Sequence, residues 1–179
     1  EKLIHKKRNI RQGAMQVLLK PKEGWSEKRL GDCLFENPDY GINAAAVPFN
    51  ESFPVYLRIT DITEDGKYSK KNLVSVNNIF SSNYYLAKGD LVFARTGASV
   101  GKTYLYDERD GKLVFAGFLI RVKTNPEILL PKFFKYFTQT KIYKDWIATN
   151  SMRTGQPGIN GNEYQELILN LPPTVDEQN

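Results

Sequence analysis

The stretch DLVFARTGASVGKTYLY, residues 90–106, decides the fold class. Its two ends, residues 90–96 and 102–106, are rich in β-branched and aromatic side chains, which is the composition of strands. A polar loop with two glycines, Gly97 and Gly101, lies between them. We therefore expect two strands joined by a turn at the centre of the chain.

The same loop has a superficial likeness to a nucleotide-binding P-loop. A P-loop has four residues between its glycines and leads into a helix whose N-terminus binds phosphate. Here only three residues separate Gly97 from Gly101, Thr96 stands where the first glycine belongs, and a strand follows Lys102. Spacing and context therefore argue against an NTPase. The simpler interpretation is a glycine turn with a solvated lysine.

Further elements flank this hairpin and predict a mixed α+β fold, β-rich with a few helices. Residues 55–60 alternate as a half-buried strand does, and 113–122 (LVFAGFLIRV) are almost continuously apolar, as in a central buried strand. The clearest helix is 131–147, which opens on a proline and carries aromatic residues three to four apart. Weaker signals predict strands at 72–76 and 167–171, and short helices at 27–30, capped by Ser26, and at 163–166.

Residues 1–20 predict the end of a coiled-coil helix. Leu3, Ile10 and Val17 are seven residues apart, with Ala14 on the same stripe. Gly13 costs this helix about 1 kcal/mol relative to alanine, so the helix is marginal alone. A flexible basic tail is the alternative. We expect this helix at 1–20, a linker at 21–24, the globular domain at 25–173 and the start of a further region at 174–179.

Composition limits the classes of function. One cysteine and one histidine exclude a disulfide framework and argue against a zinc site, and no apolar run approaches the ~18 residues of a membrane span. We therefore expect a cytoplasmic, non-membrane protein. Residues 1–24 carry seven basic and two acidic residues, which equals the whole-chain charge of +5. Residues 95–160 carry eleven basic and five acidic residues, which fits either a basic binding face or an ordinary solvated surface.

Catalytic motifs are incomplete throughout. Asn37–Tyr40 (NPDY) approaches the [DNS]-P-P-[YFW] motif of amino-methyltransferases, but an aspartate replaces the second proline and no cofactor loop precedes it. Two Asp-Gly-Lys triplets, 65–67 and 110–112, are better explained as hairpin turns than as nuclease sites. His5, in the basic tail, gives no credible catalytic triad. The sequence argues against a self-contained enzyme.

Several collinear stretches resemble a target recognition domain of the specificity subunit of type I restriction–modification systems. The N-terminal LIHKKRNIRQGAMQVLLKPKEGW (3–25) is similar to the end of that family's long conserved helix, and LPPTVDEQ (171–178) is similar to the junction into the next one. The domain itself is similar over YLRITDITEDGKY (56–68), YYLAKGDLVFARTGASVGKTYLY (84–106), VFAGFLIRVKTNP (114–126), RTGQPGINGNEYQELILNLPP (153–173) and PPTVDEQ (172–178).

The resemblance implies a non-catalytic DNA-binding module. The intact subunit of that family has two recognition domains that each read one half of a split sequence, with antiparallel helices as a spacer. Its partners are double-stranded DNA, the methylation subunits and, through the complex, the restriction subunit. S-adenosylmethionine, ATP and Mg belong to those partners, so no cofactor is expected on this chain. A protein-interaction domain with a basic helical tail is the alternative.

Residue chemistry supplies candidates for DNA contact. Lysine, arginine and backbone N–H groups bind phosphates, whereas arginine, lysine, asparagine and glutamine read bases. Because the 95–102 motif is shared by family members that read different sequences, it fits a phosphate contact or a structural turn. Sequence choice is expected in 41–54, 69–83 and 107–112. Arg58 is alternatively a paired structural residue. The candidates are Tyr40, Asn43, Arg58, Arg95, Thr96, Ser99, Lys102, Arg153, Thr154, Gln156 and Asn160.

Overall fold

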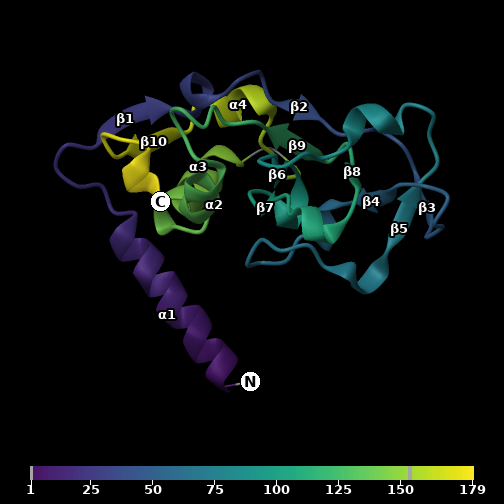
Figure 1. Ribbon diagram of the computed structural model, residues 1–179, viewed down its shortest axis with the longest axis horizontal. Helices are drawn as coiled ribbons and strands as arrows, with labels where there is room; N and C mark the ends of the chain where they lie inside the picture. Colours follow the sequence, from purple (N-terminus) through teal and green to yellow (C-terminus); the bar gives the residue numbers. More distant parts are fainter. Residues whose placement is uncertain (1, 153–154) are drawn as a thin grey trace.

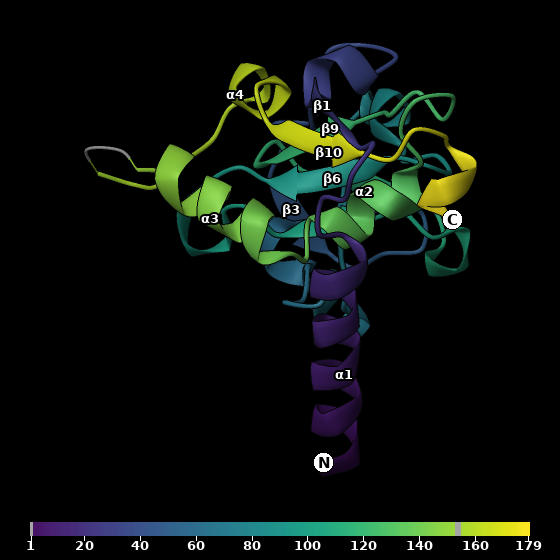
Figure 2. The same cartoon turned by 90° about the vertical axis from the view of Figure 1, so that its left-hand side faces the viewer.

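A computed structural model describes residues 2–152 and 155–179. One long helix, α1 (Lys2–Leu18), projects from a body of short strands and helices, as Figures 1 and 2 show from two directions. The described body has two four-stranded sheets, a two-stranded sheet and three further α-helices. This confirms the predicted mixed α+β fold. Among the described residues, no helix has the length and apolar character to span a membrane.

The central sheet has the order β2-β9-β6-β7 and is antiparallel throughout. One of its two inner strands, β6 (Leu91–Ala94), is buried along its whole length. It pairs with β7 (Thr103–Leu105) on one side and β9 (Leu119–Val122) on the other, and β2 (Asp39–Tyr40) forms the far edge. The pairing of β6 with β7 confirms the hairpin predicted around residues 97–101.

The second four-stranded sheet has the order β3-β5-β4-β8. Its strands are β3 (Ala46–Pro48), β5 (Val74–Val76), β4 (Val55–Leu57) and β8 (Leu113–Phe115). β4 and β8 are parallel and the other pairs are antiparallel. This sheet therefore depends on contacts between segments that are far apart in the sequence.

The single strand predicted at 113–122 is wrong. β8 belongs to the second sheet and β9 to the central sheet, with a turn at Ala116–Phe118 between them. The turn is closed by a hydrogen bond from Leu119 N to Ala116 O at 2.8 Å. A continuous apolar stretch indicates only that its residues are buried, and these residues are buried in two sheets rather than one. The segment therefore joins the two sheets.

A two-stranded sheet closes the body. β1 (Ser26–Arg29) pairs with β10 (Ile168–Leu171) in antiparallel register. The short helix predicted at 27–30 is wrong, because these residues extend to pair with β10 and helical geometry starts only at Leu30. Seven 3₁₀-helices lie among the described residues, at Leu30–Cys33, Ile59–Asp61, Lys70–Asn72, Ser81–Tyr84, Gly97–Ser99, Glu108–Asp110 and Asp176–Gln178.

The helix predicted at 131–147 is two helices, α2 (Pro131–Phe137) and α3 (Lys141–Asn150). The break has a local cause, since threonine hydroxyls offer the backbone an alternative to helical hydrogen bonds. Thr140 caps α3 by accepting a hydrogen bond from Tyr143 N at 3.3 Å. A short helix, α4 (Gly161–Gln165), leads into β10.

The largest core cluster lies between the central sheet and the helices that follow it. The ring of Phe93 in β6 is 5.6 Å from that of Phe134 in α2 and 4.9 Å from that of Tyr164 in α4, measured between centroids. Aromatic packing at these separations stabilises the core beyond simple burial of area. The spacing of aromatics in 131–147 therefore reports core packing, as expected for most of them.

α1 contacts the body near its C-terminal end. Met15 is buried, and Gln12 Nε2 donates to Gln139 O at 3.0 Å. The predicted stripe faces solvent, since Leu3, Ile10 and Val17 are each more than 60% exposed. The helix is therefore present as predicted, and its pairing in a coiled coil stays a prediction.

Candidate nucleic-acid interface

A cleft of about 690 Å³ lies between the two four-stranded sheets and collects four of the predicted site residues. Tyr40 and Asn43 come from β2 and the segment after it, Arg58 follows β4, and Arg95 follows β6. The turn between β8 and β9 forms another wall, with Phe118 in the cleft. Residues from four separate segments thus meet at the junction of the sheets.

Arg95 and Tyr40 form a stacked pair in this cleft. The guanidinium carbon of Arg95 lies 4.9 Å from the centroid of the Tyr40 ring. The Tyr40 hydroxyl accepts a hydrogen bond from Gly161 N at 3.0 Å, which fixes the ring against α4. Stacking uses the face of a guanidinium, so its in-plane N–H donors stay available for carboxylate, phosphate or guanine.

Gly41 allows the chain to pass close to the turn between the sheets. A Cβ atom at this position would lie 2.3 Å from the carbonyl oxygens of both Phe115 and Ala116. Its N–H donates to Leu119 O at 3.2 Å. The shape of the cleft wall after Tyr40 therefore requires a residue without a side chain.

Arg58 has a structural partner within the cleft wall. Its Nη2 lies 2.8 Å from Asp61 Oδ1 and its Nε lies 3.0 Å from Asp61 Oδ2. The Asp61 carboxylate is buried and also accepts from Arg58 N at 2.9 Å. We assign Arg58 a role in holding the 58–61 turn, the alternative that its position in an apolar strand had suggested.

The 95–102 loop uses most of its N–H groups internally. Gly97 N donates to Pro157 O at 2.9 Å, and Gly101 N donates to Ala94 O at 2.9 Å. Thr96 bridges to Gly158, and the N–H groups of Arg95, Val100 and Lys102 also have backbone acceptors. Ser99 contributes its carbonyl oxygen to Lys102 N at 3.0 Å. These backbone N–H groups are therefore engaged in hydrogen bonds within the protein and are not free to bind a phosphate.

Lys102 lies apart from the cleft. It precedes β7, whereas Tyr40 is in β2, and these strands form opposite edges of the central sheet, three spacings of about 4.8 Å apart. Its Nζ lies 2.6 Å from Glu64 Oε1. The structure thus separates Lys102 from Tyr40, and a phosphate contact by Lys102 stays a prediction.

The loop after α3 contributes residues of two kinds. Arg153 and Thr154 lie outside the described residues. Gln156 is exposed, and its side chain lies against Gly97. Asn160 forms a capping box for α4, because its Oδ1 accepts from Glu163 N at 3.0 Å while Asn160 N donates to Glu163 Oε2 at 2.8 Å. The Asn-x-x-Glu spacing was a sequence signal for this cap.

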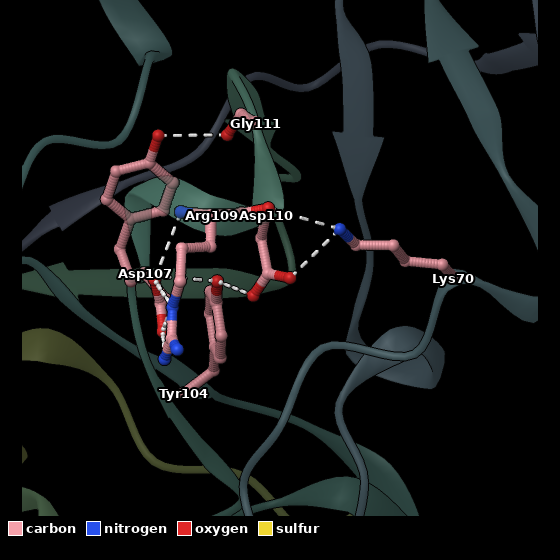
Figure 3. Close-up of polar contacts among 7 residues, drawn as sticks. Lys70, Tyr104, Asp107, Arg109, Asp110 and Gly111 are labelled. Atoms are coloured by element: carbon pink, nitrogen blue, oxygen red, sulfur yellow. Dashed lines mark hydrogen bonds and ion pairs between the residues drawn. The ribbon is translucent and has the colours of Figure 1, made fainter.

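The three segments expected to carry sequence choice gather around the second sheet. Residues 41–54 contain β3 and residues 69–83 contain β5, and these strands pair directly. Lys70 Nζ lies 3.1 Å from Asp110 Oδ1, so residues 107–112 join the same region, as Figure 3 shows. The segments therefore form one surface rather than three separate loops.

Hydrogen bonds fix the 107–112 turn in this surface. Tyr104 Oη donates to Asp110 Oδ2 at 2.8 Å, and burial raises the pKa of this tyrosine well above its usual range. Arg109 Nε donates to Asp107 Oδ1 at 2.9 Å, and hydrogen bonding to Arg109 lowers the pKa of Asp107 to about 2 (Figure 3). The turn therefore holds a defined shape at neutral pH.

Sequence reasoning missed Phe118 and Arg121, which lie in the apolar 113–122 stretch. The Phe118 side chain is 59% exposed in the cleft. Arg121 is buried, with Nη2 2.7 Å from Asp39 Oδ2 and Nη1 3.5 Å from Asp90 Oδ2. A charged residue inside an apolar run was the available signal for such a buried network. Within residues 2–152 and 155–179, no cluster of His, Cys, Asp and Glu has the makings of a metal site.

Comparisons with known proteins agree on one family. A family model described as type I restriction modification DNA specificity domain matches residues 22–179. An HsdS subunit from Thermoanaerobacter tengcongensis is 20% identical with a TM-score of 0.63, covering 89% of this chain and 40% of its own. A type I restriction-modification S subunit from M. genitalium is 16% identical with a TM-score of 0.63, covering 99% and 46%.

A further similar structure concerns complex assembly and conformational transition of the type I R-M system, with 18% identity, a TM-score of 0.64, and coverage of 89% of this chain and 40% of that one. The chain thus spans less than half the length of these solved structures. No curated protein gives a match.

Proposed function

The chain belongs to the type I restriction modification DNA specificity domain family, and from this premise we propose that it reads one half of a bipartite DNA sequence. The observation that carries the proposal is the family match over residues 22–179. In this role the chain catalyses nothing itself. It determines where partner subunits methylate adenine and where restriction begins.

We assign DNA contact first to the cleft and the surface beside it. Arg95 presents its donors from a fixed stack on Tyr40, which suits guanine or a phosphate. Asn43 is exposed at the same cleft and suits adenine. Gln156 is a further exposed candidate, next to Gly97. Arg58 and Asn160 act by positioning, through Asp61 and the α4 cap respectively.

The proposed partners supply the chemistry. Methylation subunits would bind S-adenosylmethionine, and a restriction subunit would use ATP and Mg. We further propose the division into a spacer helix at 1–20, a linker at 21–24, a recognition domain at 25–173 and a following region from 174. The solvent-facing stripe of Leu3, Ile10 and Val17 supports this division, because such a stripe is normally covered by another helix.

Selection from a random duplex library tests this function. The purified chain should enrich a short defined sequence at about 50 mM salt, and its affinity should fall linearly on a log–log plot as salt increases. Mapping methylated adenines in the source genome with and without the gene should return the same half-site. Equal binding of selected and scrambled duplexes at every salt concentration would contradict the proposal.

A protein-interaction domain is the second candidate, favoured by the exposed stripe on α1. That role alone predicts binding to a methylation subunit with no enrichment of any duplex sequence. The selection experiment separates the two, because only a reader of bases enriches a sequence.

A further inference from the structure

The most exposed apolar side chain of the described body lies at a loop tip beside the cleft. Ile79 is 88% exposed and its neighbour Phe80 is 60% exposed. Both follow β5 and precede the 3₁₀-helix Ser81–Tyr84. Two adjacent large apolar residues in water are unfavourable unless they have a partner, so this tip calls for an explanation.

The tip is held rigidly. Asn78 Oδ1 accepts a hydrogen bond from Phe80 N at 2.9 Å. Asn78 O accepts from the buried Ser81, from its N at 3.1 Å and from its Oγ at 2.7 Å. Asn83 N then donates to Phe80 O at 3.1 Å. Residues 78–83 therefore present Ile79 and Phe80 on a preformed turn.

The residues on both sides of the tip pack against residues that line the cleft. Val76 packs in one buried cluster with Ile42 and Tyr56, which line the cleft, and Tyr84 packs against the same cluster on the other side of the tip. Ala46, which also lines the cleft, is the strand partner of Val76. The apolar tip therefore rises directly beside the proposed reading surface.

The charge around the tip favours a polyanion. Residues 66–89 contain four lysines and no acidic residue, and two of these lysines, Lys67 and Lys70, pair with Asp65 and Asp110. Lys71 and Lys88 are exposed on either side of the tip in sequence. Two exposed lysines and several asparagines around an apolar tip match DNA better than they match an apolar protein surface.

The position of the tip also argues against the helical framework as its partner. β5 lies at the end of the body opposite the junction with α1, as Figure 1 shows. Two side chains also cover far less than the roughly 800 Å² per partner that stable protein interfaces bury. A contact with α1 or with a helix paired to α1 would need the tip at the other end of the molecule.

We propose that Ile79 and Phe80 form a wedge that enters a base-pair step of the DNA read by the cleft, unstacking it while neighbouring lysines hold the phosphates. Apolar wedges of this kind enter the minor groove and kink the duplex. The proposal rests on the proposed function. It adds recognition of deformable steps, such as pyrimidine–purine steps, to direct reading of bases.

The test uses the duplex that the wild-type chain selects from a random library, with 2-aminopurine placed at successive positions. The wild-type chain should raise the fluorescence at one step, because unstacking relieves quenching. The double variant Ile79→Ser/Phe80→Ser should lose this increase and bind about fivefold or more weakly. The conservative variant Ile79→Met/Phe80→Leu should retain both properties.

Phe35→Ser provides the matched control, since Phe35 is 68% exposed elsewhere on the body. It should bind and unstack the duplex like the wild-type chain, and thermal melting should show all variants folded. Unchanged affinity and fluorescence in the double variant would overturn the wedge while leaving the proposed function intact. Loss of binding to a purified methylation subunit with DNA binding unchanged would also overturn it, as a protein contact. Failure of the wild-type chain to select any duplex would instead refute the proposed function, and the wedge with it.

Discussion

The Arg58 guanidinium binds the buried carboxylate of Asp61 through two nitrogens, whereas Arg95, across the same cleft, has an aromatic ring beneath it. The two arginines should therefore behave differently when removed. Arg58→Ala leaves a buried carboxylate without its main partner and should lower the free energy of unfolding by about 2–3 kcal/mol. Urea denaturation followed by circular dichroism measures this loss.

Arg95→Ala should lower the stability much less than Arg58→Ala does, and should weaken DNA binding. Loss of the stack on Tyr40 costs about 0.5–1 kcal/mol in stability, whereas loss of a base or phosphate contact costs about 1–3 kcal/mol in affinity. Fluorescence anisotropy with the selected duplex measures the affinity. The assignment of Arg95 to the interface fails if the variant binds that duplex as tightly as the wild-type chain does.

Gly41→Ala should disrupt the body far more than Gly13→Ala. At Gly41 the new methyl group meets two carbonyl oxygens at 2.3 Å, and the expected cost is about 3 kcal/mol or more. At Gly13, inside α1, it meets nothing within 4 Å and should stabilise the helix by about 0.5–1 kcal/mol. Thermal melting and helical ellipticity measure both effects. Equal melting temperatures for the two variants would contradict the close approach at Gly41.

Two substitutions of Asn160 distinguish a role as helix cap from a role in base contact. Asn160→Ala removes the side-chain acceptor for Glu163 N and should destabilise the domain by about 1 kcal/mol. Asn160→Asp keeps an acceptor at the same position and should melt near the wild-type temperature. If Asn160 acts only as a cap, the aspartate variant should also select the same DNA sequence. A changed base at one position of the selected sequence would restore Asn160 to the reading surface.

Alkaline pH should weaken the fold through its buried tyrosines. Burial raises the pKa of Tyr68 to about 12 and raises the pKa of Tyr143 and Tyr164 well above the ordinary value of about 10. Since the folded-state pKa exceeds the unfolded one, these groups favour the folded state below pH ~10, and that stability is lost as pH rises through the folded-state pKa. Urea midpoints should fall between pH 9 and pH 11.

Absorbance of phenolate near 295 nm provides the check on this prediction. Fewer than the ten tyrosines of the chain should titrate near pH 10 while the protein stays folded. Tyr68→Phe should make the fall in urea midpoint less steep. Ionisation of every tyrosine near pH 10 in the folded protein would contradict the effect of burial.

Sequence patterns correctly predicted the elements that are determined by residues close to one another in the chain. The β6–β7 hairpin follows from strand-forming residues on either side of one glycine loop, and α1 follows from its seven-residue spacing. Predictions for 113–122 and 27–30 failed because partners distant in the chain decide them. Apolarity does not state which sheet buries Phe115 or Ile120, and β1 is a strand only because β10 pairs with it.

The candidate site shows the same division. Residue chemistry identified Tyr40, Asn43 and Arg95 as candidates, and the fold brings them to one cleft. Nothing local could show that Lys102 would face Glu64 at the opposite edge of the sheet. Phe118 escaped notice because an exposed aromatic in an apolar run looks like core until the turn at 116–118 is known.

The pairing of β1 with β10 sets the two ends of the body one strand spacing, about 4.8 Å, apart. The chain between Arg29 and Ile168 therefore begins and ends at neighbouring positions of this two-stranded sheet. Loops in that stretch that make no contact with α1 or with the C-terminal residues can change in length without moving the two paired ends. Under the proposed function, recombination at these paired strands would exchange the residues that read DNA and keep the two ends of the domain at the same spacing.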